Sequence, residues 1–295
     1  MKYAYYPGCS LSSTGIEYDL STRAVAKALG IDLWEIPEWN CCGSSSAHLT
    51  DHLLALALPA RNMAIAEAEG LDVVIPCAAC YVRSKAVEVE VKESPEMQKT
   101  ISEVIEREYT GKAKARALLD VFANDLDLNN VSALVNKPLQ DLKVACYYGC
   151  LLVRPTKLGF DDAEDPQSMD KLMQALGGTP VQWSFKTECC GASRSLDKTQ
   201  VGLTMIERIL SAAKEAGADC IATACPLCMS NLDMRQGQAG AKSGQTYNLP
   251  VFYFTELMGL ALGLNPQELG VNKHFVDTSA VVKKVVEGKG RRETA

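Results

Sequence analysis

A short apolar run that ends in two spaced cysteines, LDVVIPCAAC (residues 71–80), decides the fold of this chain. A second copy, ADCIATACPLC, follows at residues 218–228. Short runs of apolar, β-branched residues without polar alternation are typical of strands that are buried on both faces of a parallel sheet. The sequence therefore predicts two buried strands, each of which delivers a Cys-x-x-Cys pair at its carboxyl end.

Both pairs belong to larger sets of cysteines that repeat along the chain. The first set is Cys9, Cys41, Cys42, Cys77 and Cys80, and the second set is Cys150, Cys189, Cys190, Cys225 and Cys228. Equivalent cysteines lie 148 residues apart, except that the leading pair lies 141 apart, so the second copy holds seven extra residues. We place this insert in the polar stretch 160–166. Because the repeat is half the chain, we predict a duplicated domain, with the first copy and a helical extension at residues 1–138 and the second copy at residues 139–295.

Helical patterns alternate with the predicted strands. They cover residues 16–29, closed by Gly30, residues 49–69, closed by Gly70, and residues 198–216, opened by Asp197 as N-cap and closed by Gly217. This alternation predicts an α/β fold of two tandem copies, each a small, mostly parallel sheet flanked by helices, related by pseudo-two-fold symmetry. Ligands of such sheets gather at the carboxyl ends of the strands, where the cysteines are expected.

The segment 85–116 separates the two copies and balances seven acidic residues against seven basic ones. Glu103 and Arg107 stand four residues apart, as do Glu108 and Lys112, which favours helices with a solvated, charged face. A face that docks a partner is the alternative. The boundary between the copies is expected within residues 124–140, before a strand at residues 142–147.

The composition excludes several classes of function. The 295 residues carry 36 acidic and 30 basic side chains, and this net charge of −6 argues against a general nucleic-acid binder. No apolar run approaches the roughly 20 residues that span a bilayer. The first residues show no apolar secretory core, so we expect a cytoplasmic protein. Twelve cysteines in such a chain indicate metal or redox chemistry rather than disulfides.

Ten thiols in two sets of five suit some metal sites better than others. Cys146 and Cys220 have no counterpart in the other copy, so we expect them to pack as small apolar side chains. Zinc takes four ligands, and none of the three histidines belongs to the repeat. A cubane iron–sulfur cluster also takes four thiolates, and no Cys-x2-Cys-x2-Cys run is present. Five thiols with an adjacent pair therefore favour a cluster of unusual shape, which requires sharp turns at Gly43 and Gly191. An iron left with room for an outside sulfur would make such a site reactive rather than a mere electron relay.

The two cysteine sets, Cys-x31-Cys-Cys-Gly-x33-Cys-x2-Cys and Cys-x38-Cys-Cys-Gly-x33-Cys-x2-Cys, carry a family resemblance. The chain resembles the B subunit of heterodisulfide reductase, a protein with a duplicated cysteine-rich (CCG) domain, and YAYYPGCS (residues 3–10) and WNCCGSS (residues 39–45) are similar to this subunit in particular. The resemblance implies two noncubane [4Fe-4S] clusters that face one another across the domain interface, one on each set of five cysteines. It also implies the reduction of the mixed disulfide of coenzyme M and coenzyme B to two thiols, a step of methanogenesis.

Electrons must come from elsewhere, because the chain has no G-x-G-x-x-G motif after a strand and no P-loop, and so no flavin or nucleotide motif. The resemblance implies two partners, a ferredoxin-like C subunit, together with an A subunit that holds flavin and iron–sulfur clusters. It also implies that electrons can be bifurcated at the A subunit, to which a hydrogenase or formate dehydrogenase can be attached.

The substrate implied by the resemblance carries a sulfonate, a phosphate and a carboxylate, which basic groups recognise. Arg194 is the first candidate, followed by Lys186 and Arg154, and an ordinary surface charge is the alternative for each. His48 and His52, one helical turn apart, are candidate proton donors, with helix capping or packing as the alternative.

Two rival functions use the same residues. One is an electron-transfer subunit with CCG domains in a succinate, lactate or glycolate oxidoreductase. The other is a scaffold that zinc stabilises and that only docks partners. Iron and inorganic sulfide would exclude the scaffold, and stoichiometric zinc would support it.

Overall fold

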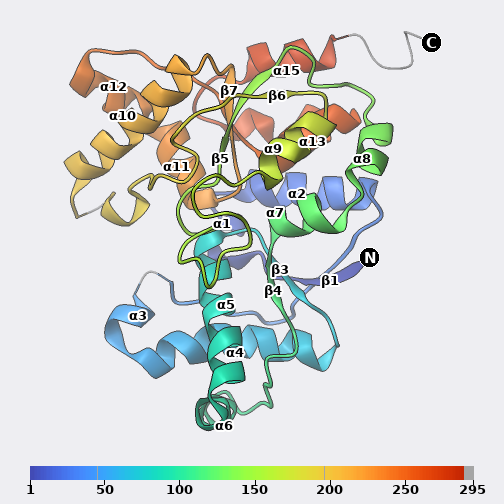
Figure 1. Cartoon of the computed structure of the whole chain (residues 1–295), viewed down its shortest axis with the longest axis vertical. Coiled ribbons are helices and arrows are strands. Elements are labelled where there is room, and N and C mark those ends of the chain that lie inside the picture. The colour runs from blue at the N-terminus through green and yellow to red at the C-terminus, as the bar shows by residue number, and fades with distance from the viewer. Residues whose placement is uncertain (45, 196, 289–295) are drawn as a thin grey trace.

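The computed structural model describes residues 1–44, 46–195 and 197–288, and it contains two four-stranded parallel sheets with helices around them (Figure 1). The first sheet has the order β2-β1-β3-β4, with β1 at Lys2–Tyr5, β2 at Asp32–Glu35, β3 at Val73–Ile75 and β4 at Ala115–Ala117. The second has the order β6-β5-β7-β8, with β5 at Lys143–Tyr147, β6 at Thr179–Pro180, β7 at Cys220–Thr223 and β8 at Val251–Tyr253. The same order in both sheets confirms the predicted α/β duplication.

The helices surround the sheets and link their strands. In the first half they are α1 (Gly8–Leu11), α2 (Ile16–Ala28), α3 (Ala47–Thr50), α4 (His52–Ala68), α5 (Ala78–Glu93), α6 (Pro95–Val104), α7 (Leu118–Asp120), the π-helical turn η1 (Val121–Asp125) and α8 (Leu128–Leu134). In the second half they are α9 (Ser168–Ala175), the 3-10 turn η2 (Ala192–Arg194), α10 (Thr199–Glu215), α11 (Pro226–Met234), α12 (Gln236–Ser243), α13 (Phe254–Leu262), α14 (Pro266–Leu269), the 3-10 turn η3 (Val271–Lys273) and α15 (Ser279–Val286). None of the described helices is long and apolar enough to cross a membrane.

The predicted cysteine-bearing strands form the centres of the sheets. In the first sheet β3 lies between β1 and β4, and in the second β7 lies between β5 and β8. All residues of β3 and β7 are buried, as expected for strands covered by helices on both faces. The burial of these two apolar strands therefore determines the positions of Cys77 and Cys225, which follow their carboxyl ends.

Two predicted helix boundaries were wrong. The helix predicted at 49–69 is two helices, α3 and α4, because Asp51 is extended and its carboxylate accepts a hydrogen bond of 2.7 Å from the amide of Leu54. Asp197 does not cap α10, since Lys198 holds that position without a side-chain bond. The Asp197 carboxylate instead pairs with Arg194 at 3.0 Å.

The segment 85–116 is less solvated than its charges predicted. Its helix α6 ends at Val104, before the predicted partner Arg107, and Glu103 lies 3.9 Å from Lys99 instead. Glu88 on α5 is buried, and its carboxylate accepts a hydrogen bond of 2.8 Å from the amide of Ala115. A charge expected at the surface therefore ties α5 to β4.

The two halves share one apolar core through a reciprocal exchange of helices. Helix α2 of the first half packs against α13 of the second, and α9 of the second half packs against η1 and α7 of the first. Figure 1 shows α2 and α13 close together. Because α2 and α9 follow equivalent strands, as do α7 and α13, this packing fits the predicted pseudo-two-fold relation. The boundary at residues 138–139 stays a prediction.

Candidate metal centre

The strand ends bring the CxxC pairs to the start of two helices. Cys77 is the N-cap residue of α5 and Cys225 is the N-cap residue of α11, so Cys80 and Cys228 lie in the first turns. The N-terminus of a helix carries a partial positive charge, which favours thiolates. Of these four thiols only Cys225 has a lowered pKa, because neighbouring thiols and burial raise the pKa of Cys77, Cys80 and Cys228.

In the first set, buried and exposed sulfurs lie together. The Sγ atoms of Cys42 and Cys80 are 3.2 Å apart, and both residues are buried. The hydrogen bond between these two thiols lowers the pKa of Cys42 to about 7, while the pKa of Cys80 is well above its ordinary value. Cys9 and Cys41 are exposed and interact with each other. The first set thus contains two buried sulfurs, those of Cys42 and Cys80, and a solvent-exposed rim formed by Cys9 and Cys41.

The second set has the same internal contacts. The Sγ atoms of Cys190 and Cys228 are 3.6 Å apart. A hydrogen bond from Cys150 lowers the pKa of Cys189 to about 6, and the same bond is the main cause of the raised pKa of Cys150. Both Cys150 and Cys189 are half-buried. The paired contacts therefore recur in the second set, but the pKa of Cys189 is lowered where the pKa of its counterpart Cys41 is raised, and the second rim is more enclosed.

The two sets meet at their CxxC pairs. Cys77 and Cys225 lie close enough to each other, across the interface between the halves, to shift each other's pKa. The interaction with Cys225 is the leading cause of the raised pKa of Cys77, whereas interactions with Cys228 and then Cys77 lower the pKa of Cys225 well below its ordinary value. Residues at equivalent positions touch, as at an isologous interface. The ten repeated cysteines thus form one continuous group.

Glycines shape the backbone around the sulfurs. Gly43 and Gly191 have φ angles of 70° and 75°, which gives each Cys-Cys-Gly segment the predicted sharp turn. Their amides lie 3.5 Å and 3.3 Å from the Sγ atoms of Cys41 and Cys189. A turn that points an amide at a sulfur can stabilise a thiolate.

Two further glycines keep space open beside the CxxC pairs. A Cβ atom on Gly8 would lie 3.2 Å from the Sγ of Cys80, and one on Gly149 would lie 3.1 Å from the Sγ of Cys228. Both glycines also have positive φ angles. A side chain at either position would therefore crowd a sulfur.

A pair of equivalent tyrosines holds the Cys-Cys segments, and the sequence analysis missed it. The Tyr6 hydroxyl donates to the carbonyl of Asn40 at 2.9 Å, and the Tyr147 hydroxyl donates to the carbonyl of Glu188 at 2.6 Å. Each acceptor residue directly precedes a Cys-Cys pair. The shared tyrosine in YYPGC (residues 5–9) and CYYGC (residues 146–150) was the available signal.

The donor set suits a multinuclear iron–sulfur cluster better than a single metal ion. Among the described residues, no three His, Cys, Asp or Glu side chains converge as ligands of one ion. The repeated thiols instead lie in neighbouring pairs within each set. Thiolates are the usual ligands of iron–sulfur clusters, whose several irons can engage separated sulfurs. Cys146 and Cys220 are fully buried strand residues, as their expected packing role requires.

The basic residues predicted to bind substrate are already paired to different extents. Lys186 is buried, and its ammonium lies 2.9 Å from Asp165, 3.0 Å from Asp170 and 3.1 Å from the carbonyl of Pro166. The ammonium thus donates hydrogen bonds to Asp165 and to Pro166, and it forms an ion pair with Asp170. The position of Lys186 therefore suits a role in holding the fold.

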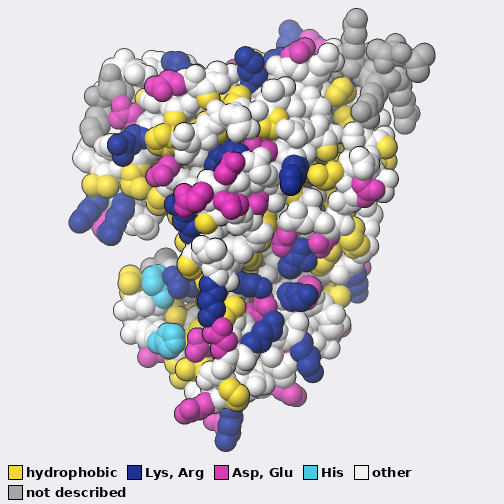
Figure 2. Space-filling model, in the orientation of Figure 1, with side chains coloured by type: hydrophobic (Ala, Val, Ile, Leu, Met, Phe, Trp, Pro, Cys, Tyr) yellow, Lys and Arg dark blue, Asp and Glu magenta, His cyan; other side chains and the backbone are white. Residues whose placement is uncertain are grey.

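Arg154 and Arg194 are more accessible than Lys186. Arg154 donates to Glu164 and Thr187, each at 3.1 Å. Arg194 is half-exposed on η2, with Asp197 as its partner. His48 and His52 are exposed on α3 and α4. Figure 2 shows a notch between the part of the surface that carries α3 and the part that carries α10, with His side chains on the α3 side and Lys or Arg side chains on the other.

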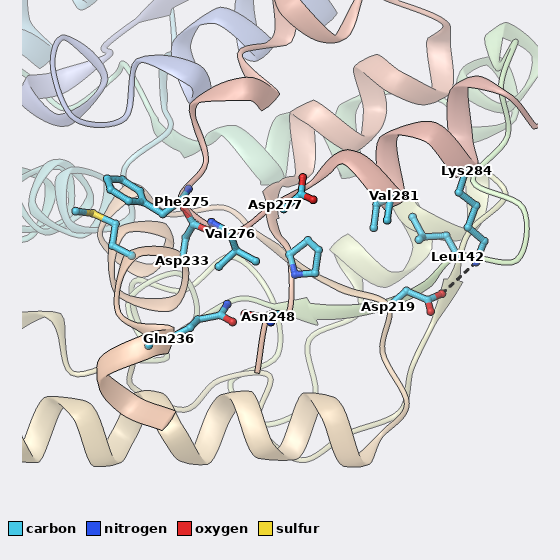
Figure 3. A pocket seen from close by; sticks show the side chains of 14 residues that line it. Leu142, Asp219, Asp233, Gln236, Asn248, Phe275, Val276, Asp277, Val281 and Lys284 are labelled. Atoms are coloured by element: carbon cyan, nitrogen blue, oxygen red, sulfur yellow. Dashed lines mark hydrogen bonds and ion pairs between the residues drawn. The ribbon is translucent and has the colours of Figure 1, made fainter. Parts of the chain in front are cut away.

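A surface groove lies away from the cysteines. It has a volume of about 800 Å³ and lies between α11, α12 and the segment that leads into α15 (Figure 3). It contains no cysteine, and Asp233 within it accepts hydrogen bonds from the amides of Phe275 and Val276 at 2.7 Å and 3.0 Å. The groove is therefore separate from the sulfur chemistry.

Comparisons with known proteins agree with the duplication. The model of the cysteine-rich domain family named CCG matches residues 3–83 and 144–233. A membrane anchor subunit of 8-methylmenaquinol:fumarate reductase from Wolinella succinogenes is 35% identical over 282 residues, which cover 94% of this chain and 98% of that protein. The B subunit of a ferredoxin:CoB-CoM heterodisulfide reductase from Methanosarcina mazei is 30% identical over 293 residues, with 97% of each chain covered.

A solved structure shares the fold alone. The crystal structure of a hypothetical protein from Helicobacter pylori superposes with a TM-score of 0.76 at 13% identity and covers 95% of this chain and 52% of that one.

Proposed function

The chain belongs to the cysteine-rich (CCG) domain family, and from this we propose that it is the disulfide-cleaving subunit of a heterodisulfide reductase. Its substrate would be the mixed disulfide of coenzyme M and coenzyme B, and the reaction would be a step of methanogenesis. The observation that carries the proposal is the presence of two complete five-cysteine sets that touch at Cys77 and Cys225. The similarity to the B subunit from Methanosarcina mazei supports it.

Two adjacent redox sites suit the chemistry of a disulfide. The reaction RSSR′ + 2 e⁻ + 2 H⁺ gives RSH and R′SH, so two electrons and two protons enter as one S–S bond breaks. A noncubane [4Fe-4S] cluster on each set would supply one electron and an iron that accepts an outside sulfur. The chain's own residues would hold the sites side by side, with the turns at Gly43 and Gly191 directing adjacent thiols to one cluster.

The proposed function places the chain in a larger assembly. The relatives named above are subunits of reductases, and an iron–sulfur oxidoreductase chain of this family needs an outside electron donor. We propose two partners, a ferredoxin-like C subunit, together with an A subunit that bears flavin and iron–sulfur clusters. A hydrogenase or formate dehydrogenase would be a further electron source, with bifurcation at the A subunit. The cytoplasm is the proposed compartment.

A second function has its own supporting observation. The relative from Wolinella succinogenes is 35% identical and belongs to a fumarate reductase. The same cysteine sets would then pass electrons between a quinol and fumarate, and no outside thiol would need to reach the irons. This is the alternative predicted from the sequence, an electron-transfer subunit of a succinate, lactate or glycolate oxidoreductase.

Binding of a thiol distinguishes the two functions. The anaerobically purified full chain, oxidised and then mixed with coenzyme M, should give a changed EPR signal if an iron accepts an outside sulfur. Ethanesulfonate, which carries the same sulfonate without a thiol, is the matched control and should leave the signal unchanged. No change with coenzyme M, together with rapid oxidation of the reduced chain by a fumarate reductase partner, would favour the electron-transfer function.

A further inference from the structure

A buried pair of tyrosines crosses the interface where the two cysteine sets meet. Tyr18 lies on α2 and Tyr253 ends β8, so each half supplies one ring. The rings stack with centroids 4.0 Å apart and planes within 9° of parallel, and both side chains have no exposed surface. This stack is part of the packing between α2 and α13 that joins the halves.

Both tyrosine hydroxyls lack a partner among the described residues. A buried hydroxyl without an acceptor is rare, because it has given up its hydrogen bonds to water and gained none in return. Two such hydroxyls on stacked rings therefore point to an acceptor that the polypeptide does not supply.

The cysteine sets lie beside these hydroxyls. A Cβ atom on Gly15 would lie 3.2 Å from the Tyr253 hydroxyl and 3.3 Å from the Cβ of Pro226, the residue that follows Cys225. Beyond the effect of burial, the charges of Cys225 and Cys77 raise the pKa of Tyr18. The pKa of Tyr253 is also raised, by burial first, then by Glu17 and other neighbours that include Cys225.

We propose that Tyr18 and Tyr253 donate hydrogen bonds to sulfur of the clusters that Cys77 and Cys225 bind, and that these bonds raise the reduction potential. The inference rests on the proposed iron–sulfur sites but not on the identity of the substrate. Reduction adds negative charge to the cluster, and hydrogen bonds to its sulfur atoms stabilise that charge. Neither tyrosine would need to lose its proton for this effect.

Redox titration of the anaerobically purified full chain, followed by EPR, tests the inference. Tyr18→Phe and Tyr253→Phe keep the stacked rings and remove only the hydroxyls. Each should lower the equilibrium constant for one-electron reduction about tenfold, which corresponds to 59 mV, and the double variant should lower it further.

A third tyrosine offers a matched control. Tyr109 is also fully buried with an unpartnered hydroxyl, but its charged neighbours are Glu88 and Glu67 rather than cysteines. Tyr109→Phe should leave the potential unchanged. As a second readout, ENDOR spectra of the unaltered reduced protein should show exchangeable protons coupled to the cluster that both variants weaken.

The possible results separate this inference from the proposed function. Full iron content with an unshifted potential in both variants would overturn the inference, because the hydroxyls would then bond at most to trapped water. An equal shift in Tyr109→Phe would overturn it as well, since the effect would then be a general one of packing. A chain without iron would overturn both the inference and the proposed function.

Discussion

The two cysteine sets have equivalent spacing and contacts but differ in how far solvent reaches them. Cys9 and Cys41 are exposed, whereas their counterparts Cys150 and Cys189 are half-buried. Lys186, which lies three residues before Cys189, pairs with Asp165 in the loop at residues 151–167 and with Asp170 on α9. The spacing of the cysteines is thus repeated, while the exposure of the sulfurs differs between the copies.

The strongest test of this equivalence removes one buried sulfur from each set. Cys42→Ser and Cys190→Ser should each lose about half of the iron and inorganic sulfide, about four of eight atoms of each. Disulfide reduction should be lost in both variants, because the proposed reaction needs both sites. Elemental analysis and turnover assays of the anaerobically purified chains measure these effects.

A cysteine outside the sets provides the control for this pair. Cys220→Ser changes a fully buried thiol on β7 that has no repeated counterpart, so iron should stay complete. Full iron in Cys42→Ser or Cys190→Ser would contradict the assignment of that set.

The next prediction concerns the stability of the second set, where Lys186 lies three residues before Cys189. Lys186→Ala should lower the free energy of unfolding by ~3–5 kcal/mol, because it leaves the buried carboxylate of Asp170 unpaired. Arg194→Ala breaks an exposed pair and should cost less than ~1 kcal/mol. Urea unfolding measures both. Wild-type stability in Lys186→Ala would mean that its ammonium is free to serve the substrate, as the sequence predicted.

A third test asks whether both CxxC pairs need the same free space. Gly8→Ala and Gly149→Ala should each release iron from their own set, since the added methyl group would crowd Cys80 or Cys228. Each change also carries about 1 kcal/mol of backbone strain from the positive φ. Gly30→Ala isolates that strain, because Gly30 has a φ of 68° with nothing within 4 Å of the added atom. Equal iron loss in all three variants would show that strain alone is responsible.

The smallest expected difference lies in the tyrosines that hold the Cys-Cys segments. Tyr147→Phe should cost about 1 kcal/mol of unfolding free energy, because it removes a hydrogen bond to the carbonyl of Glu188. Tyr6→Phe should cost less, since Asn62 also donates to the carbonyl of Asn40, at 2.8 Å. Denaturant titrations of the two variants compare these losses, and a larger loss in Tyr6→Phe would reverse the expected order.

Local patterns in the sequence predicted the strands and the turns that carry the cysteines, while the meeting of the two sets across the interface was implied by the family resemblance. The apolar runs before Cys77 and Cys225 became β3 and β7, and the turns at Gly43 and Gly191 have the expected positive φ. These features depend on residues close together in the chain, where periodicity and backbone preference are informative. The repeat in the sequence defined the two sets of five cysteines, and their role as cluster ligands stays a prediction from the resemblance.

The missed features depend on distant partners or on competing local bonds. The apolar pattern continues across Asp51, so it does not reveal that this carboxylate caps a new helix. The burial of Lys186 depends on Asp170 and Asp165, which precede it by 16 and 21 residues, on α9 and in the loop before that helix. An amphipathic face also does not identify its partner, so the packing of α2 against α13 could not be predicted.

The central claim is that each half of the chain binds its own iron–sulfur cluster through five cysteines. Iron, zinc and inorganic sulfide, measured together on the full chain purified without oxygen, test it most directly. The account predicts about eight iron and eight sulfide per chain with little zinc. A colourless protein with stoichiometric zinc and no inorganic sulfide would contradict it.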